Sequence, residues 1–460
     1  MFRLLPCLFA LLFVAACAKT IPPVQVAPTQ PQSEEVPFPR RELPPEVMFD
    51  VPRLVTRAVS VSDAPLMSAS EQMILHAKAL ERFFAPWRMA RTSLDAGEAF
   101  WGVKAFARKQ GYSENLQPYP VERWNRLVAL QNMPGYPAMA VPGIITRNTS
   151  VRVLPTLRPF FLDPKQPGEG FPFDYFQNSA LWLGSPVLIS HVSTDRAWYL
   201  VETAYTYGWV RVEDVALVGK AFRNQYESRR MAALLHDDLP LIDGVGRLLG
   251  QTHIGALFPV QAQTGQGLTV KVPVRGASGQ AEIQTAQLSS LQAAPTPLPL
   301  TSRAIATLAD AMAGQQYGWG GLFENRDCSS TMRDLFLPFG VFLPRNSALQ
   351  AKGAGSFIPL DKLRPDAKLD AIRAQGVPFL SFIWLQGHIG LYLGADQRGE
   401  PLMLHNIWGV RTMLPSGGEG RAVVGRLTIS TLRPGEYRAD VRADSFLARV
   451  RGLAVVSLPR

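Results

Sequence analysis

The spacing of hydrophobic residues changes several times along the chain, and each change predicts a different structure. Residues 4–16 carry no charge and follow Arg3. An apolar stretch this short behind a positive charge is typical of an export signal, so we expect residues 1–16 to be a signal peptide. Residues 17–48 are crowded with Pro, Gln, Glu and Val and lack periodic apolar spacing. This composition predicts a semi-rigid tether.

Helical spacing begins at Ser68. Ser68 and Glu71 have the spacing of a capping box, and apolar residues then recur at intervals of three and four until Pro86. Tryptophans continue through further helical or irregular sequence, where we expect them to anchor the packing. The pattern predicts a small helical domain over residues 49–142.

Short β-rich runs separated by Gly, Pro, Asn and Asp replace the helical spacing after this point. Over residues 143–218 they predict a small β-barrel, and the Tyr-Gly-Trp-Val run at 207–210 resembles bacterial SH3-like domains. Residues 219–298 predict a second, more divergent barrel, with strict alternation over 268–274. Prolines then mark a linker to residues 299–460, where we expect the chemistry to lie.

Composition and charge narrow the class of protein. The 460 residues are 47% hydrophobic and 18% charged, which is globular composition of a length that suggests several domains. The net charge of +10 favours polyanionic surroundings. No Lys/Arg block stands out, so we expect no nucleic-acid partner.

The cysteines carry a separate signal. Cys7 lies inside the expected signal peptide, and Cys17 follows Val-Ala-Ala, which resembles the acylation site of bacterial lipoproteins. Cleavage of an ordinary signal peptide after Ala16 is the alternative. Only Cys328 then remains for the folded protein. A lone thiol is either catalytic or a small buried hydrophobe, and composition does not separate the two.

The sequence around Cys328 favours a catalytic thiol. A Gly-rich turn precedes Cys328, and the apolar residues up to Phe336 follow at helical spacing, so Cys328 lies at or just before a helix N-terminus. We expect the helix dipole and the free N–H groups there to lower the pKa of the thiol. The same N–H groups could form part of an oxyanion hole.

Two histidines are candidate partners for the thiol. His388 follows an apolar run and a tight turn at the start of an expected strand, and His405 lies on what looks like the neighbouring strand. Antiparallel pairing can bring both side chains to one face. His388 would then act as the base, and His405 could orient its ring. Either histidine alone would more often be structural. The spacing does not favour a zinc site, so we expect no metal and no cofactor.

Several motifs in a fixed order resemble the NlpC family of papain-like cell-wall cysteine peptidases. They are Tyr317-x-Trp319-Gly-Gly, Asp327-Cys328-Ser329, Leu-Pro-Arg345-x-Ser with Gln350, and His388-x-Gly-x-Tyr-x-Gly. The resemblance implies an α+β papain-like fold, a Cys nucleophile, a His base and a polar third residue. It also implies cleavage of the γ-D-glutamyl to diamino-acid bond in peptidoglycan stem peptides. Ser330 stands where the family usually has Gly. Segment 361–376 replaces a shorter turn of the family before the His388 strand, so the motifs do not predict the local shape of the substrate cleft.

With a helical part and two SH3-like barrels in front, the chain resembles the lipoprotein and γ-D-glutamyl-L-diamino-acid endopeptidase branch. The implied binding residues are Asp327, Ser329, Tyr317, Trp319, Arg345 and, from the first barrel, Tyr175. We expect Asp327 to accept the ammonium of a free N-terminal L-Ala, with Asp174 and Tyr175 offering a carboxylate and an aromatic ring. Ordinary barrel packing is the alternative for Tyr175.

Two other functions stay open from the sequence. One is an amidase or transpeptidase acting on another amide of the wall, and the other is a non-catalytic wall-binding lipoprotein. We expect a monomer that is exported and held by lipid on Cys17 at the periplasmic face of a membrane, the outer membrane being the favoured one.

Overall fold

The computed structural model describes residues 54–441 and 446–458. The expected signal peptide over 1–16, the lipid-bearing Cys17 and the tether over 17–48 lie outside the described residues and stay predictions. Within the part of the chain that the structure describes, no helix has the length and apolar character needed to cross a membrane.

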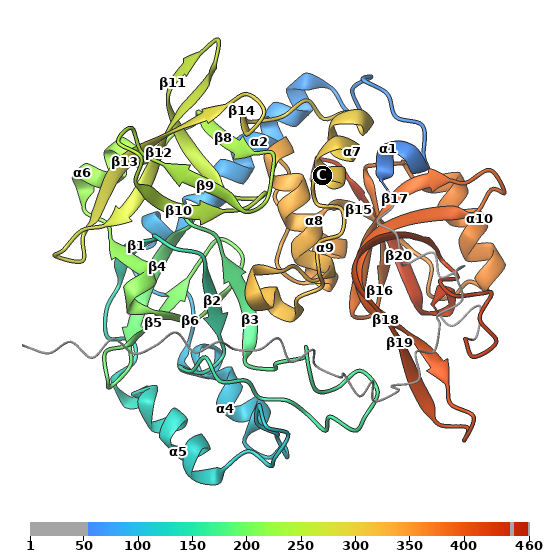
Figure 1. Ribbon diagram of the computed structural model, residues 1–460, viewed down its shortest axis with the longest axis horizontal. Helices are drawn as coiled ribbons and strands as arrows, with labels where there is room; N and C mark the ends of the chain where they lie inside the picture. Colours follow the sequence, from blue (N-terminus) through green and yellow to red (C-terminus); the bar gives the residue numbers. More distant parts are fainter. Residues whose placement is uncertain (1–53, 442–445, 459–460) are drawn as a thin grey trace, which may run out of the picture. The chain divides into compact units, whose positions relative to one another are not determined.

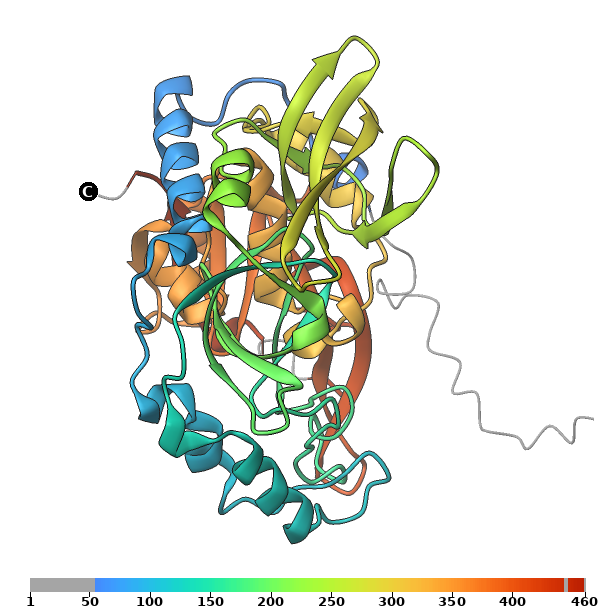
Figure 2. The ribbon, with the colours of Figure 1, turned by 90° about the vertical axis from the view of Figure 1, so that its left-hand side faces the viewer.

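The N-terminal region is helical, and its helices pack on different parts of the molecule. The helices are α1 (Val55–Ala58), α2 (Ala69–Phe83), α3 (Ala96–Ala99), α4 (Trp101–Phe106) and α5 (Val121–Leu130). The predicted capping box of Ser68 and Glu71 is present at the start of α2. Val55 of α1 lies in the core of the C-terminal region, whereas Phe106 of α4 lies in an aromatic core of the first barrel. Figures 1 and 2 show α2 and α5 at different places along the barrels.

The first barrel is an antiparallel sheet in the order β3-β2-β6-β5-β4-β1-β7. Its strands are β1 (Val141–Ile145), β2 (Thr149–Arg152), β3 (Gln177–Leu181), β4 (Pro186–Val192), β5 (Trp198–Glu202), β6 (Tyr207–Arg211) and β7 (Val215–Leu217). The inward-facing residues are aliphatic, among them Val151, Val187 and Val201. The long β2–β3 loop, residues 153–176, extends from this barrel toward the C-terminal region (Figure 1).

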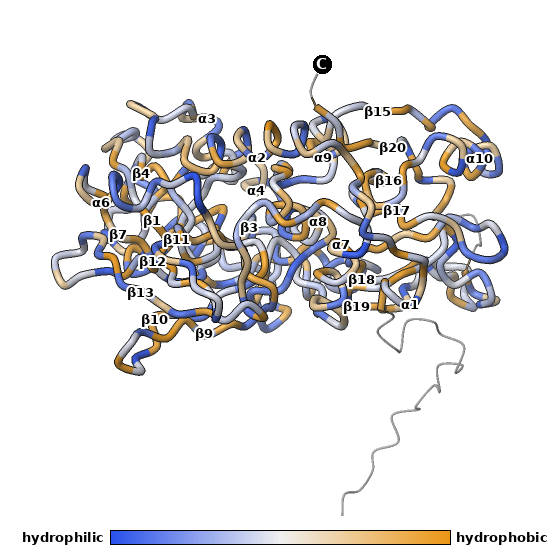
Figure 3. Tube along the Cα trace, turned by 90° about the horizontal axis from the view of Figure 1, so that it is seen from above, coloured by the Kyte–Doolittle hydropathy of each residue, from blue (hydrophilic) through white to orange (hydrophobic). Residues whose placement is uncertain are grey.

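Helix α6 (Lys220–Tyr226) leads into the second barrel, whose strands pair in the orders β13-β12-β11-β8-β14 and β10-β9. The strands are β8 (Met231–Leu234), β9 (Leu239–Ile242), β10 (Leu248–Thr252), β11 (Leu257–Thr264), β12 (Gly267–Arg275), β13 (Ala281–Ser289) and β14 (Ala293–Pro295). The alternation predicted over 268–274 lies on β12, where Leu268, Val270 and Val272 are buried. Figure 3 shows hydrophobic and hydrophilic residues interspersed along both barrels.

The C-terminal region places helices against one antiparallel sheet in the order β15-β20-β16-β17-β18-β19. The helices are α7 (Ser302–Ala311), α8 (Cys328–Phe336), α9 (Ser347–Gly353) and α10 (Pro365–Gln375). The strands are β15 (Gly355–Pro359), β16 (Ser381–Leu385), β17 (His388–Ala395), β18 (Pro401–Met413), β19 (Glu419–Thr431) and β20 (Val450–Val456). Helix α8 packs against β17 and β18, between the sheet and the barrels (Figure 1). The segment that departs from the family pattern mostly forms α10, whose Leu369 and Ile372 pack in a core with Met403.

Candidate active site

Cys328 is the first residue of α8. Asp327 is the N-cap, and its carboxylate accepts a hydrogen bond from the backbone N–H of Ser330 at 2.9 Å. Met332 and Leu335 are fully buried and fix the helix in the core. The capped end and the buried face together set the direction in which the thiol is presented.

The Trp-Gly-Gly motif brings this helix against the first barrel. Gly320 and Gly321 have φ values of 61° and 85°, in the left-handed region that favours glycine. A Cβ at Gly320 would lie 2.4 Å from the carbonyl oxygen of Gln177, and one at Gly321 would lie 2.6 Å from Cβ of Ala180. Only glycine therefore allows the loop before Cys328 to lie this close to β3.

An ion pair holds the residue before the thiol. Nη2 of Arg345 lies 2.6 Å from Asp327, and Nε of Arg345 donates to the hydroxyl of Ser179 in β3 at 2.8 Å. Nη1 of Arg345 also donates to the hydroxyl of Ser329 at 2.9 Å. The side-chain amide of Gln350 donates to the backbone carbonyl of Ser329 at 2.7 Å. The motif residues Arg345 and Gln350 thus anchor the loop that carries Cys328.

The two histidines meet side by side on neighbouring strands. His388 is the first residue of β17, and its Nε2 lies 2.8 Å from Nδ1 of His405 in β18. Nε2 of His405 lies 3.0 Å from the hydroxyl of Ser430 in β19. Phe446 covers both rings at centroid distances of 5.7 Å. Burial lowers the pKa of His388 well below its ordinary value and lowers the pKa of His405 to about 3.

The thiol of Cys328 does not have the lowered pKa expected from its helix position. Burial, and then the negative charge of Asp327, raise its pKa to about 12. Hydrogen bonds from the backbone N–H groups of Ile389 and Ser329 act in the opposite direction but are outweighed. The sequence-based expectation is therefore wrong for the free protein, because it counted the helix terminus and omitted burial and the adjacent carboxylate. The bond from Ile389 also places the thiol beside the residue that follows His388.

A pocket of about 1000 Å³ lies at the thiol. Its walls include residues of three regions of the chain. The C-terminal region contributes Tyr317, Trp319, Asp327, Cys328, Ser329 and Arg345, the first barrel contributes Tyr175, Tyr205 and Tyr207, and the N-terminal region contributes Trp101, Phe106 and Lys109. All six residues named from sequence as binding residues border this one pocket. Within the described residues, no group of His, Cys, Asp and Glu side chains gathers closely enough to hold a metal ion.

The structure contradicts one of the two carboxylates expected to meet the substrate ammonium and leaves the other as a prediction. Asp174 is 1% exposed and forms an ion pair with Arg152 at 2.7 Å, so it is part of the barrel interior and does not face substrate. Both oxygens of Asp327 already accept hydrogen bonds from Arg345. Asp327 is therefore engaged within the protein, but it also borders the pocket, so its contact with the substrate ammonium stays a prediction. The carboxylate that accompanies Tyr175 is Glu169, which accepts a hydrogen bond from the Tyr175 hydroxyl at 3.0 Å.

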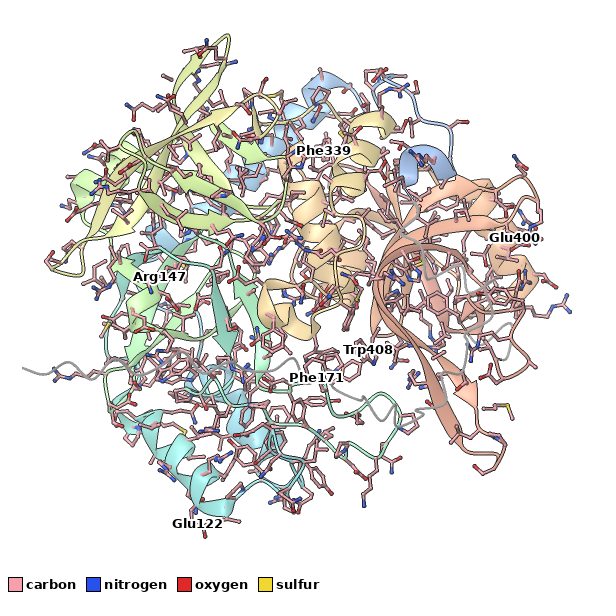
Figure 4. The ribbon with its side chains drawn as sticks, viewed as in Figure 1. Glu122, Arg147, Phe171, Phe339, Glu400 and Trp408 are labelled. Carbon is pink, nitrogen blue, oxygen red and sulfur yellow. The ribbon has the colours of Figure 1, made fainter. Side chains whose placement is uncertain are left out.

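The β2–β3 loop meets the C-terminal region through aromatic rings. The ring centroid of Phe173 lies 5.2 Å from that of Trp319 and 6.0 Å from that of Trp408. Phe171 of the same loop and Trp408 of β18 are labelled in Figure 4. Nη2 of Arg421 in β19 donates to the carbonyl oxygen of Pro167 at 3.2 Å. The loop thereby lies against the edge of the C-terminal region.

Residues 314–413 match the family model of the NlpC/P60 family. This chain carries an NlpC/P60 domain. Residues 6–136 match the N-terminal stabilising domain of NLPC_P60 proteins, 159–211 an SH3 domain of the SH3b1 type, and 220–264 an SH3 domain of the SH3b2 type. The recognition made from the sequence motifs is confirmed, together with the expected class, a hydrolase of the NlpC/P60 peptidase family.

The chain, which carries the NlpC/P60 domain, also resembles two solved structures. An NlpC/P60 endopeptidase from Photobacterium damselae subsp. piscicida superposes with a TM-score of 0.79 at 24% identity, covering 88% of this chain and 97% of that one. An NlpC/P60 family protein from Bacillus cereus ATCC 10987 has a TM-score of 0.45 at 13% identity, covering 69% of this chain and 99% of that one. The first likeness shows a shared fold. A comparison with curated proteins finds no match.

Three residues of the NlpC/P60 site carried no signal in the sequence. Ser430 and Glu169 lie outside the family motifs. Strand register brings Ser430 to His405, and the shape of the β2–β3 loop brings Glu169 to Tyr175. Arg326 is adjacent to a motif, but its partner Asp237 lies in the second barrel, 2.8 Å away. Because Arg326 and Asp237 lie far apart in the sequence, their contact leaves no local sequence pattern.

Proposed function

We propose that the chain is a cysteine endopeptidase that hydrolyses the γ-D-glutamyl to L-diamino-acid bond of peptidoglycan stem peptides. The observation that carries the proposal is the pocket at Cys328, whose thiol accepts a hydrogen bond from Ile389 next to the hydrogen-bonded pair of His388 and His405. The choice of bond rests on the resemblance of the motifs to the NlpC family.

In this mechanism the thiol and the imidazole are both neutral before attack. As Sγ of Cys328 bonds to the carbonyl carbon, His388 takes the thiol proton, and then gives it to the leaving amine as the C–N bond breaks. Water attacks the resulting thioester, His388 removes its proton, and the thiol is restored when the C–S bond breaks. The N–H groups at the start of α8 face the developing oxyanion.

Tyr317 is a further donor in this proposal. Its pKa is raised well above the ordinary value by burial and then by the charges of Cys328 and Asp327. The phenol therefore keeps its proton throughout the working pH range. A protonated phenol beside the thiol can donate a hydrogen bond to the oxyanion, whereas a phenolate would oppose it.

A preference for a free N-terminal L-Ala follows from the walls of the pocket. Aromatic residues of the first barrel and of the N-terminal region line part of the pocket. A substrate that continues into a glycan chain would meet these walls. In this proposal Asp327, which borders the pocket, and Glu169, which accepts a hydrogen bond from the pocket residue Tyr175, supply negative charge for the substrate ammonium.

The proposal is tested by digestion of defined peptides and mass analysis of the products. The substrate is the tripeptide L-Ala-γ-D-Glu-diamino acid, made with diaminopimelate or lysine, and compared with the same peptides N-acetylated or carrying the muramyl sugar. We expect release of L-Ala-D-Glu from the free peptides, with a much lower kcat/KM for the blocked ones. Cys328→Ala should reduce the rate by about 10⁶-fold, as for other triad nucleophiles.

Each alternative gives a different result in this assay. Cleavage at another amide would replace the endopeptidase by an amidase or transpeptidase. If the folded parent protein cleaves none of the peptides, the result would favour a non-catalytic wall-binding lipoprotein. Equal rates for free and N-acetylated peptides would overturn the preference for a free amine while leaving the bond assignment in place.

A further inference from the structure

Ser430 ends a chain of hydrogen bonds that begins at the candidate base. The residue is 1% exposed, on β19. Its hydroxyl donates to the carbonyl oxygen of Thr431 at 2.8 Å, and Nε2 of His405 lies 3.0 Å from the same hydroxyl. Nδ1 of His405 then faces Nε2 of His388 at 2.8 Å.

The protons in this chain can be assigned in order. A serine hydroxyl has one hydrogen, and because the Thr431 carbonyl can only accept, we assign the hydrogen to that bond, which leaves oxygen lone pairs facing His405. Nε2 of His405 must therefore carry a hydrogen. Burial lowers the pKa of His405 to about 3, so the ring is neutral and its Nδ1 has none.

The assignment then passes to His388. Since Nδ1 of His405 has only a lone pair, Nε2 of His388 must donate to it. His388 is also neutral, because burial lowers its pKa well below the ordinary value. Its remaining nitrogen, Nδ1, is left unprotonated and available to take a proton.

We propose that Ser430 is a positioning residue that fixes the tautomer of His388 through His405, so that Nδ1 of His388 is the base for the thiol. The inference deepens the proposed cysteine peptidase and rests on it. Without the hydroxyl, His405 can move its hydrogen to Nδ1 and point it at His388. His388 would then have to accept at Nε2 and carry its own hydrogen on Nδ1, where it cannot receive the thiol proton.

The activity test compares three variants in the full chain. Ser430→Ala should lower kcat with little change in KM, by at least about tenfold and by less than the ~10⁴-fold loss seen when the wrong tautomer is imposed directly on a triad histidine. Ser430→Thr keeps the hydroxyl and should restore most of kcat. The matched control is Thr428→Val, because Thr428 is buried on the same strand and is the direct cross-strand neighbour of His405. We expect the control to keep the parent kcat.

A second measurement reads the tautomers without relying on activity. With ¹⁵N-labelled histidine, long-range ¹H–¹⁵N spectra distinguish a protonated Nε2 from a protonated Nδ1, and the chain has only six histidines. We expect both His388 and His405 to be protonated at Nε2 in the parent and in Ser430→Thr, and Nδ1-protonated forms to appear in Ser430→Ala.

The outcomes separate this inference from the proposed function. Nδ1-protonated His388 in the parent, or unchanged tautomers and kcat in Ser430→Ala, would overturn it. So would an equal loss of kcat in Thr428→Val and Ser430→Ala, which would indicate a general effect on packing. If the parent cleaves no stem peptide, the proposed function fails, and the tautomer spectra still decide whether Ser430 sets the histidine pair.

Discussion

At the scale of single residues, burial shifts the pKa values of Cys328 and His388 in opposite directions. It raises the pKa of the thiol to about 12 and lowers the pKa of the imidazole well below its ordinary value. In both cases the neutral form is favoured, because removal from water penalises charge. In the proposed mechanism the proton therefore moves during attack, and no thiolate–imidazolium pair forms beforehand.

These shifts predict how the rate depends on pH. The proposed mechanism requires a neutral His388, and the lowered pKa of His388 means that its ring is protonated only in acid. We expect kcat/KM for the stem tripeptide to stay level from about pH 8 to below about pH 6.5, the ordinary histidine pKa, and to fall only at lower pH. Initial rates across this range provide the measurement. A loss of kcat/KM with a midpoint at or above pH 6.5 would show that the pKa of His388 is not lowered.

Single residues differ in how readily sequence reveals them. Cys328 and His388 could be found because each lies in a motif and at the end of a regular element that hydrophobic spacing predicts. Ser430 could not, since its relation to His405 depends on the register of β18 and β19. The raised pKa of the thiol was also hidden, because burial is a property of the folded chain.

At the scale of elements, the start of α8 is stabilised by a charge as well as by a cap. Burial alone would raise the pKa of Asp327, but Arg345 and the hydrogen bonds of Ser330 lower it to about 2. The folded pKa thus lies below the unfolded value of about 3.9. The carboxylate contributes roughly 2 kcal/mol of stability above that value, and this is lost as the pH falls from about 4 to about 2.

Asp327→Asn should therefore destabilise the protein at pH 7 by roughly 3 kcal/mol, because Arg345 is left buried without its partner. The difference from the parent should shrink as the pH approaches 2, since the parent carboxyl is then protonated. Denaturant unfolding at pH 7 and pH 3 measures both effects. Asp63→Asn is the control, because Asp63 pairs with Arg303 on the exposed surface and should contribute less than about 1 kcal/mol. A loss that is independent of pH would contradict the charge argument.

The elements themselves followed from the sequence where spacing was regular. The capping box at Ser68 begins α2, and the alternation over 268–274 lies on β12. The β2–β3 loop has no such period, so its path along the edge of the C-terminal region was not predictable. That path places Tyr175 at the pocket with Glu169 bonded to its hydroxyl, and no spacing in the sequence distinguishes Glu169 from Asp174.

At the scale of the whole molecule, Arg326 connects the loop of Cys328 to both barrels. The side chain is fully buried, with Nη atoms 2.8 Å from Asp237 of the second barrel and Nε 2.6 Å from Asp334 of α8. Its guanidinium lies 5.4 Å from the ring centroid of Trp182, which follows β3 of the first barrel. The barrels are thus part of the support of the catalytic loop.

Asp237→Asn should for this reason reduce both stability and activity, although Asp237 does not border the pocket. Breaking one side of a buried ion pair costs about 3–5 kcal/mol, and we expect a loss near the lower end because Asp334 remains. Unfolding curves and kcat/KM of the full chain measure the two effects. Asp238→Asn is a matched control, since the neighbouring Asp238 side chain is 76% exposed. Equal behaviour of the two variants would show that the buried pair does not support the loop.

The wide spacing of the pocket residues along the chain also bears on when the proposed activity can first appear during synthesis. Trp101, Tyr175 and Arg345 come from widely separated parts of the chain, and the hydroxyl that orders the histidines comes later still, at Ser430. Contacts over such separations need both segments to have been made, and closing the long intervening chain is slow. A nascent chain that has released Cys328 but not β19 therefore has a thiol without an ordered base. The order of the residues along the polypeptide delays peptidase activity until almost the entire chain has been made, so no separate inhibitory segment is needed for that delay.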